Sequence, residues 1–193
     1  YCKIKASSNS NPNGKEETWI VAEDLANQVS NLVLGEDAKI LETFKGSKLE
    51  GLWYEHPFAE FVDYNSLKEN HPKVHTVVLS KEYVDTTSGT GLVHCAPGCG
   101  PEDFEVGYRN GLPAYNEVNE NGVYCESMGK FSGWIAKKDD RKFIQELDDL
   151  GVLLKSASVT HDYAHCERCK NPIIYRATEQ WFLAVEKLKA EML

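Results

Sequence analysis

The sequence lacks an apolar run as long as the roughly 20 residues that a membrane-spanning helix needs, and no signal peptide opens it. It also lacks regularly spaced cysteines. The six that are present follow no framework pattern, in a chain of 193 residues that is large enough to fold without disulfides. These absences argue against a membrane partner and against a secreted, disulfide-stabilised protein. We therefore expect a protein of the reducing cytoplasm.

Positive charge is also scarce. The chain has 21 lysines and arginines against 30 aspartates and glutamates, which gives a formal net charge of −9. Such a surface repels phosphate, so this chain alone is not expected to bind nucleic acid non-specifically. A nucleic-acid end would have to be delivered by a basic neighbouring domain. Apolar residues make up 41%, which is enough for a packed core and too much for a disordered chain.

Hydrophobic periodicity and turn residues predict more strands than helices, in no regular alternation. The expected strands are Tyr1–Ala6, Trp19–Val21, Ala38–Phe44, Val74–Leu79, Leu92–Ala96 and Ile173–Arg176, with a hairpin of Tyr115–Val118 and Val123–Tyr124. The expected helices are Ala22–Leu34, Pro101–Asn110, Lys137–Leu150 and Gln180–Leu193. We predict a mixed α/β fold with a β-rich core and peripheral helices. Because the first residues already alternate like a strand, the chain looks like a fragment that begins inside a sheet. Residues 1–159 would form the main domain and residues 160–193 a connector.

The densest motif runs from Gly89 to Phe104 and reads GTGLVHCAPGCGPEDF. A strand flanked by glycines ends at His94, a turn rich in proline and glycine follows, and a helix begins with Asp103 near its start. Glycine lets the backbone approach a ligand closely. The partial positive charge of a helix N-terminus keeps Asp103 ionised, as a partner of an α-ammonium group must be. The plainer alternative is a tight strand-turn-helix in which Asp103 caps the helix and His94 is satisfied in the core.

This motif resembles the signature of the editing domain that is inserted in the isoleucine, valine and leucine tRNA ligases, which are class I aminoacyl-tRNA synthetases. The form with HCAP at His94 and GPED at Gly100–Asp103 is similar to the isoleucine member. The valine member usually has Lys at the His94 position, and the leucine member usually has Met. Residues 41–58 and 161–182 also resemble the isoleucine member, so the resemblance covers nearly the whole chain. The editing domain of the valine or leucine member is the alternative within this family.

The resemblance implies a barrel-like core and a hydrolytic site that removes misattached valine. Isoleucine and valine differ by one methylene, which is worth only about 1–3 kcal/mol in a pocket, and these ligases are the standard example of that problem. By resemblance, the catalytic candidates are Asp103, which binds the α-ammonium group of the wrong amino acid, and His94, which lines the side-chain pocket and excludes isoleucine. Thr90 and Gly91 are further substrate-binding candidates. The expected substrate is valyl-tRNA of the isoleucine tRNA, with valyl adenylate as a second one.

The implied partners are the aminoacylated 3′ end of tRNA and the catalytic domain of the same polypeptide. Editing itself implies no cofactor, and ATP would serve only the ligation reaction of the parent enzyme, because this chain contains neither an HxGH nor a KMSKS segment. In the family, a threonine-rich segment holds the terminal adenosine and precedes the strand that matches Tyr1–Lys5. This chain contains no such segment. We therefore expect half of the substrate site, centred on His94 and Asp103.

A single CxxC pair, Cys166 and Cys169, has His161 and His165 close by. A structural zinc site needs four ligands, so three interpretations stay open. The pair is half of a site completed by a CxxC outside the chain, part of a self-contained site that uses a nearby histidine, or two thiols without a metal. A small metal-binding or interaction module is the non-enzymatic alternative to editing. No ligand spacing connects the three remaining unassigned histidines, which are expected at the surface or in loops: His56, His71 and His75.

Overall fold

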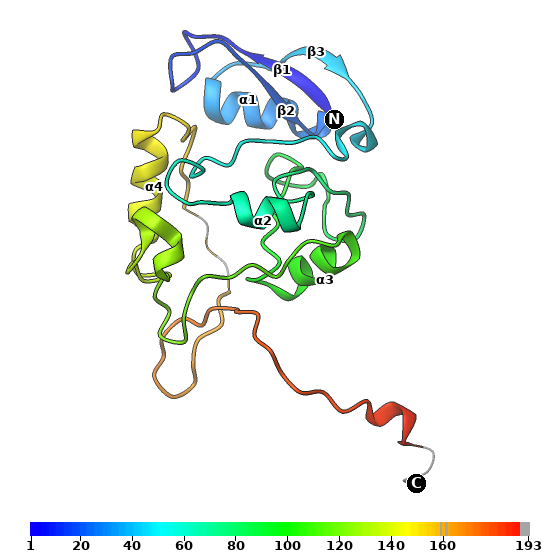
Figure 1. Ribbon diagram of the computed structural model, residues 1–193. Helices are drawn as coiled ribbons and strands as arrows, with labels where there is room; N and C mark the ends of the chain where they lie inside the picture. The colour runs from blue at the N-terminus through cyan, green and yellow to red at the C-terminus, as the bar shows by residue number, and fades with distance from the viewer. Residues whose placement is uncertain (159, 161, 190–193) are drawn as a thin grey trace.

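The computed structural model describes residues 1–158, 160 and 162–189, and its strands form one open antiparallel sheet (Figure 1). Strand β1 (Cys2–Ala6) lies in the centre, between β2 (Glu17–Val21) and β3 (Lys39–Thr43). Every residue of β3 is exposed, whereas alternate residues of β1 are buried. The centre of the sheet therefore belongs to the core, and β3 is a solvent-facing edge.

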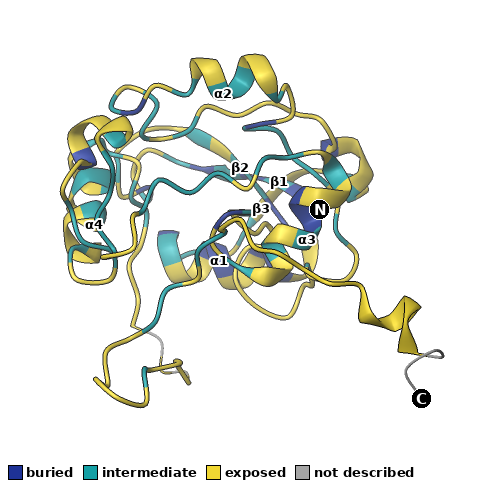
Figure 2. Cartoon of the chain, turned by 60° about the horizontal axis from the view of Figure 1, so that its bottom comes forward, coloured by how far each residue is buried: buried dark blue, intermediate teal, exposed yellow. Residues whose placement is uncertain are grey.

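The main hydrophobic core lies between this sheet and one helix. Cys2, Ile4 and Ala6 are fully buried, as expected for a strand with one covered face. Helix α1 (Ala26–Leu34) covers that face and ends at Gly35, whose left-handed backbone (φ 72°) is a common helix stop. Figure 2 shows that buried residues gather around β1 and α1, while α2 and α4 are mostly exposed or half-buried.

The rest of the described chain is made of short helices and long irregular loops. The other helices are α2 (Asn65–Asn70), α3 (Pro101–Asn110) and α4 (Asp140–Asp149), and the 3-10 turns are η1 (Glu23–Leu25), η2 (Gly46–Leu49), η3 (Glu126–Phe131) and η4 (Val185–Lys187). These loops have their own core, which is aromatic. Phe131 is fully buried, and the rings of Phe58, Trp134 and Phe143 lie 4.7 to 5.2 Å from it, centroid to centroid.

The three predicted helices that precede residue 151 are confirmed, and α3 has the predicted bounds. The helix expected over residues 22–34 begins with η1 before becoming α1, and the one expected over residues 137–150 is shorter at both ends. The first three predicted strands are confirmed as β1, β2 and β3. The mixed α/β class is thus confirmed, but the barrel-like core is not, because the described strands form an open three-stranded sheet.

Three predicted strands are wrong. Residues 74–79 form an isolated bridge between Trp53 and Thr76 instead of a strand, although backbone hydrogen bonds also join Val77 and His75 to residues 51, 52 and 54. In residues 92–96 the Ala96 amide donates to a side chain instead of a neighbouring strand. Residues 173–176 are irregular, next to the bridge between His165 and Pro172.

The C-terminal region also differs from its prediction. In place of the helix expected over residues 180–193 the structure has η4, and residues 190–193 lie outside the described residues. Residues 178–189 extend away from the body of the protein (Figure 1), and the side chain of Trp181 is fully exposed. None of the described helices is both long enough and apolar enough to cross a membrane.

Candidate functional site

The glycine-rich loop that opens the motif is fastened to the end of the sheet. The Tyr1 hydroxyl donates to the carbonyl oxygen of Gly91 at 2.7 Å, and the Ala22 amide donates to the carbonyl oxygen of Thr90 at 2.8 Å. Gly91 has a left-handed backbone (φ 74°), and a Cβ added there would lie 2.4 Å from the Cβ of Ala22. Position 91 therefore requires glycine for both its conformation and its close contact, and the loop has one fixed position on the core.

Thr90 and Gly91 border a surface hollow, together with residues 83, 85, 88, 89, 92 and 93. The Thr90 hydroxyl turns back on its own loop, where it donates to the carbonyl oxygen of Leu92 at 3.1 Å. It therefore shapes the loop, and the prediction that it contacts substrate stays a prediction. Neither His94 nor Asp103 lines this hollow.

Asp103 lies in the first turn of α3, which starts with Pro101. The proline supplies a preset φ and no amide hydrogen, both of which suit the first helical position. Oδ2 of the half-buried Asp103 carboxylate accepts a hydrogen bond from the Ala96 amide at 3.1 Å. In the described residues Oδ1 has no hydrogen-bond partner. The carboxylate thus fastens the turn to the helix with one oxygen and keeps an acceptor for a ligand on the other.

Two thiols lie close to this carboxylate. Burial raises the pKa of Cys95 to about 11, and the negative charge of Asp103 adds to that rise. The pKa of Cys99 is raised by the same two causes, burial first. Thiolate is the nucleophilic form of cysteine, and at neutral pH both side chains are protonated thiols. Neither thiol is therefore activated as a nucleophile by its surroundings.

The turn between the two catalytic candidates is held by distant parts of the chain. The carbonyl oxygen of Gly98 accepts hydrogen bonds from Asn116 Nδ2 at 2.7 Å and from the Ala177 amide at 2.9 Å. A Cβ at Gly98 would lie 2.1 Å from the carbonyl oxygen of Tyr115. The segment that contains Ala177 comes from the predicted connector, so that segment packs directly on the motif.

His94 is exposed, and its one described ring contact is with His56, which belongs to a group of packed aromatic side chains from other loops. The centroid of His56 lies 6.5 Å from that of His94, and His75 is stacked on His56 at 5.0 Å. His56 and His75 lie in loops, which is one of the two predicted locations, and both are half-buried. No spacing in the sequence connects the three residues. The only local signal was the unusual density of aromatic residues around His56, in the segment WYEHPF.

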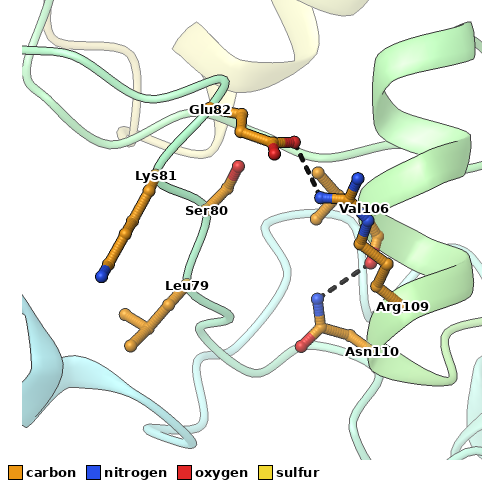
Figure 3. Close-up of a pocket in the computed structure, with 7 residues that line it drawn as sticks. All are labelled: Leu79, Ser80, Lys81, Glu82, Val106, Arg109 and Asn110. Atoms are coloured by element: carbon orange, nitrogen blue, oxygen red, sulfur yellow. Dashed lines mark hydrogen bonds and ion pairs between the residues drawn. The ribbon is translucent and has the colours of Figure 1, made fainter.

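Figure 3 shows a second hollow, between residues 79–82 and the end of α3. Arg109 projects into it, but its guanidinium group is paired with Glu82 at 2.7 Å and with Glu105. Both carboxylates raise the pKa of Arg109 and neutralise its charge. The hollow is therefore poorly suited to a phosphate or another anion, and neither catalytic candidate lines it.

The CxxC pair lies at the tip of a loop that folds back on itself. The Cys166 amide donates to the carbonyl oxygen of Asn171, and the Lys170 amide donates to that of Cys166, both at 2.9 Å. Hydrogen bonds to the Cys166 sulfur from the amides of Cys169 and Arg168 lower the pKa of this thiol. All six cysteines are free. Among the described residues no three metal-ligand side chains come together, and His161 lies outside them.

Comparison with known proteins identifies the relatives of the chain, although no family model matches it. It is 44% identical over 194 residues to the isoleucine–tRNA ligase of Pyrococcus furiosus and 42% identical over 193 residues to that of Archaeoglobus fulgidus. The ligase of Methanothermobacter marburgensis is 46% identical over 177 residues. The chain is homologous to a segment of the isoleucine–tRNA ligases. These matches cover 92–100% of the chain and only 16–18% of each ligase.

The structure brings the two catalytic candidates to one turn without direct contact between their described side chains. The Asp103 carboxylate accepts a hydrogen bond from the Ala96 amide, two residues after His94. It is therefore held against the short stretch of backbone that carries the His94 imidazole. Thr90 and Gly91 lie at the opposite end of residues 92–94 and form the loop that fixes this stretch to the sheet. The motif is therefore a single local scaffold.

Proposed function

We propose that this segment is the editing domain of an isoleucine–tRNA ligase and that it hydrolyses valine from the isoleucine tRNA. The observation that carries the proposal is the Asp103 carboxylate, which is oriented through Oδ2 and keeps Oδ1 for a ligand, at a turn that also presents His94. An ionised acceptor beside a half-buried turn suits an α-ammonium group. The homology to the isoleucine–tRNA ligases supports a place within such an enzyme.

The reaction is the hydrolysis of an ester. The oxygen of a water molecule bonds to the ester carbonyl carbon, the bond from that carbon to the ribose oxygen breaks, and the ribose oxygen takes up a proton. Valine and uncharged tRNA are released. Asp103 holds the ammonium group, so the carbonyl carbon is presented in one position, and positioning of this kind supplies much of the rate in hydrolytic sites. His94 forms the wall that excludes isoleucine by size. Valyl adenylate would be attacked in the same way.

The parent enzyme supplies what this segment does not contain. We propose that the ligation site, with its ATP, belongs to the catalytic domain of the same polypeptide, and that other domains hold most of the tRNA. The segment spans about 17% of the related ligases, and its net charge of −9 does not attract nucleic acid. An enzyme of this kind works where charged tRNA is used, so we place it in the cytoplasm.

Substitution of Asp103 in the complete ligase tests the proposal. Asp103→Ala removes both the bond to Ala96 and the partner of the substrate ammonium, and Asp103→Asn keeps an acceptor for the amide but loses the charge. We expect both variants to lose deacylation of valyl-tRNA by at least about 100-fold, since a charge-assisted bond to a desolvated ammonium is worth several kcal/mol. Glu102→Ala, an exposed acid in the same turn, is the matched control and should behave like the wild type.

The comparison of the two Asp103 variants separates binding from folding. If Asp103→Asn deacylates normally while Asp103→Ala does not, the carboxylate serves only to hold the turn, and its substrate role is wrong. Isoleucine ligation should persist in all three variants, because that reaction takes place in another domain. A wild-type ligase that leaves valyl-tRNA intact would refute the editing function itself.

For Cys166 and Cys169 we propose half of a structural zinc site, completed by two ligands from elsewhere in the parent polypeptide. The amide hydrogen bonds to the Cys166 sulfur favour the thiolate that zinc requires. Zinc there would join the returning segment to the rest of the enzyme. Metal analysis of the complete ligase is the test: Cys166→Ser should lose one equivalent of zinc, whereas Cys125→Ser should keep it. Equal zinc content would exclude the site, and loss of zinc with full editing would make the metal purely structural.

A further inference from the structure

Two histidines from other loops, His56 and His75, lie next to His94 of the motif. The rings of His56 and His75 are stacked, with centroids 5.0 Å apart and planes 18° from parallel. The ring of Tyr64 packs edge-on against both, at 5.2 and 4.8 Å. On the exposed side of this group the His94 ring lies 6.5 Å from that of His56. His94 is therefore the outermost member of a layered arrangement whose inner members are fixed by packing.

His75 occupies its position at an energetic cost. Its backbone is left-handed (φ 60°), a conformation that costs a non-glycine residue about 1–2 kcal/mol. Its Nδ1 atom is buried and has no hydrogen-bond partner among the described residues. The Tyr54 amide donates to its carbonyl oxygen at 2.9 Å and holds the backbone in place. Strain and an unsatisfied polar atom persist where the surrounding structure enforces them, and such features concentrate at functional sites.

The inner rings carry no charge at neutral pH. Burial is the main cause that lowers the pKa of His56 to about 4, and smaller contributions come from His75, His94 and Lys68 when those neighbours are protonated. The pKa of His75 is lowered as well, mainly by burial. His56 Nδ1 accepts a hydrogen bond from the Phe58 amide at 3.2 Å, so its ring is held in one orientation with the proton on Nε2. A rigid, neutral, aromatic surface thus stands behind His94.

We infer that His56 and His75 are positioning residues for amino-acid selection, whose stack fixes the place of the His94 ring. This inference rests on the proposed editing function. A wall that separates two side chains differing by one methylene must be held to within about 0.5 Å, and an exposed imidazole without support changes rotamer freely. The stack removes that freedom. Its neutrality also suits an aliphatic side chain, because a charge behind the wall would keep water in the pocket.

Substitution of His56 in the complete ligase tests the inference. His56→Ala removes the ring behind His94, and His56→Phe keeps an aromatic ring of similar size without ring nitrogens. Deacylation of valyl-tRNA and of isoleucyl-tRNA is measured for each variant, with kcat and KM separately. We expect His56→Ala to hydrolyse isoleucyl-tRNA at least about tenfold faster than the wild type, with valine hydrolysis retained and discrimination recovered in His56→Phe. His71→Ala, at the end of α2 and outside the stack, is the matched control.

Every outcome decides one of the two proposals. An unchanged ratio of valine to isoleucine hydrolysis in His56→Ala, or an equal loss of both activities, refutes the positioning role while leaving editing intact. If His56→Ala does not fold, His56→Leu replaces it, since leucine fills the volume without stacking; discrimination equal to that of His56→Phe would then refute the inference. A wild-type enzyme that hydrolyses neither ester refutes the editing function, and Asp103→Ala reports on that function independently.

Discussion

The Asp103 side chain has two roles at this turn. The Asp103 carboxylate accepts the Ala96 amide with one oxygen and has its other oxygen available for a ligand, so removing it changes both local structure and chemistry. His94 is simpler because it is exposed, and its described ring contact is with His56. A substitution at His94 therefore disturbs the scaffold little, and its effect on substrate choice is easier to interpret.

At this scale we predict that His94→Ala allows the complete ligase to hydrolyse isoleucyl-tRNA. A shorter side chain leaves room for the additional methylene, which is worth about 1–3 kcal/mol, or roughly 10–200-fold in rate. His94→Phe keeps the wall and should spare isoleucyl-tRNA. The rates of both esters are followed with labelled amino acids. Loss of valine hydrolysis in His94→Ala without any attack on isoleucyl-tRNA would instead make His94 a catalytic or structural residue.

At the scale of elements, the motif is a loop, an irregular stretch and a helix joined to the sheet at fixed points. The bounds of α3 follow from local signals: Pro101 begins it, and Gly111 ends it in a left-handed conformation (φ 71°). The role of Gly91 cannot be predicted from the local sequence, because it depends on a contact with a distant residue. Its lack of a Cβ lets the loop touch Ala22 at the end of β2. Gly89 is also left-handed (φ 70°), but no atom would contact a Cβ there.

These two glycines provide a matched pair for a stability measurement. Gly89→Ala should cost about 1–2 kcal/mol, the price of a left-handed alanine. Gly91→Ala should cost a further 1–3 kcal/mol or so, because its Cβ overlaps Ala22 and forces the loop from the sheet. Urea denaturation of the chain gives both free energies of unfolding. If the two variants are equally stable, the loop is not fastened to the sheet as the structure indicates.

At the scale of the whole molecule, charge and extent argue for dependence on other domains. The chain carries a net charge of −9 and corresponds to about 17% of the related ligases. Residues 178–189 extend away from the body (Figure 1), and the side chains of Trp181 and Phe182 are almost completely exposed. Large exposed aromatic side chains of this kind favour a contact with another part of a larger protein.

We therefore predict that the isolated chain binds tRNA weakly. With no excess of positive charge to neutralise phosphate, its Kd for the isoleucine tRNA should be no tighter than about 10⁻⁴ M at physiological salt, the weak end of non-specific binding. Fluorescence anisotropy with labelled tRNA measures it, and the complete ligase, under the same conditions, is the control. Sub-micromolar binding by the isolated chain would show that this segment carries its own tRNA site.

Local physics let the sequence by itself determine α1, α3 and β1, whereas Asp103 and His94 were singled out as site candidates by a family resemblance. Caps, left-handed glycines and hydrophobic periodicity act within a few residues of one another. The stacking of His56 on His75 was decided only by the tertiary structure, as was the hydrogen bond from Ala96 to Asp103. Residues 92–96 are irregular because a strand exists only where a second strand accepts its hydrogen bonds. The packing of distant segments determines whether such a second strand is there.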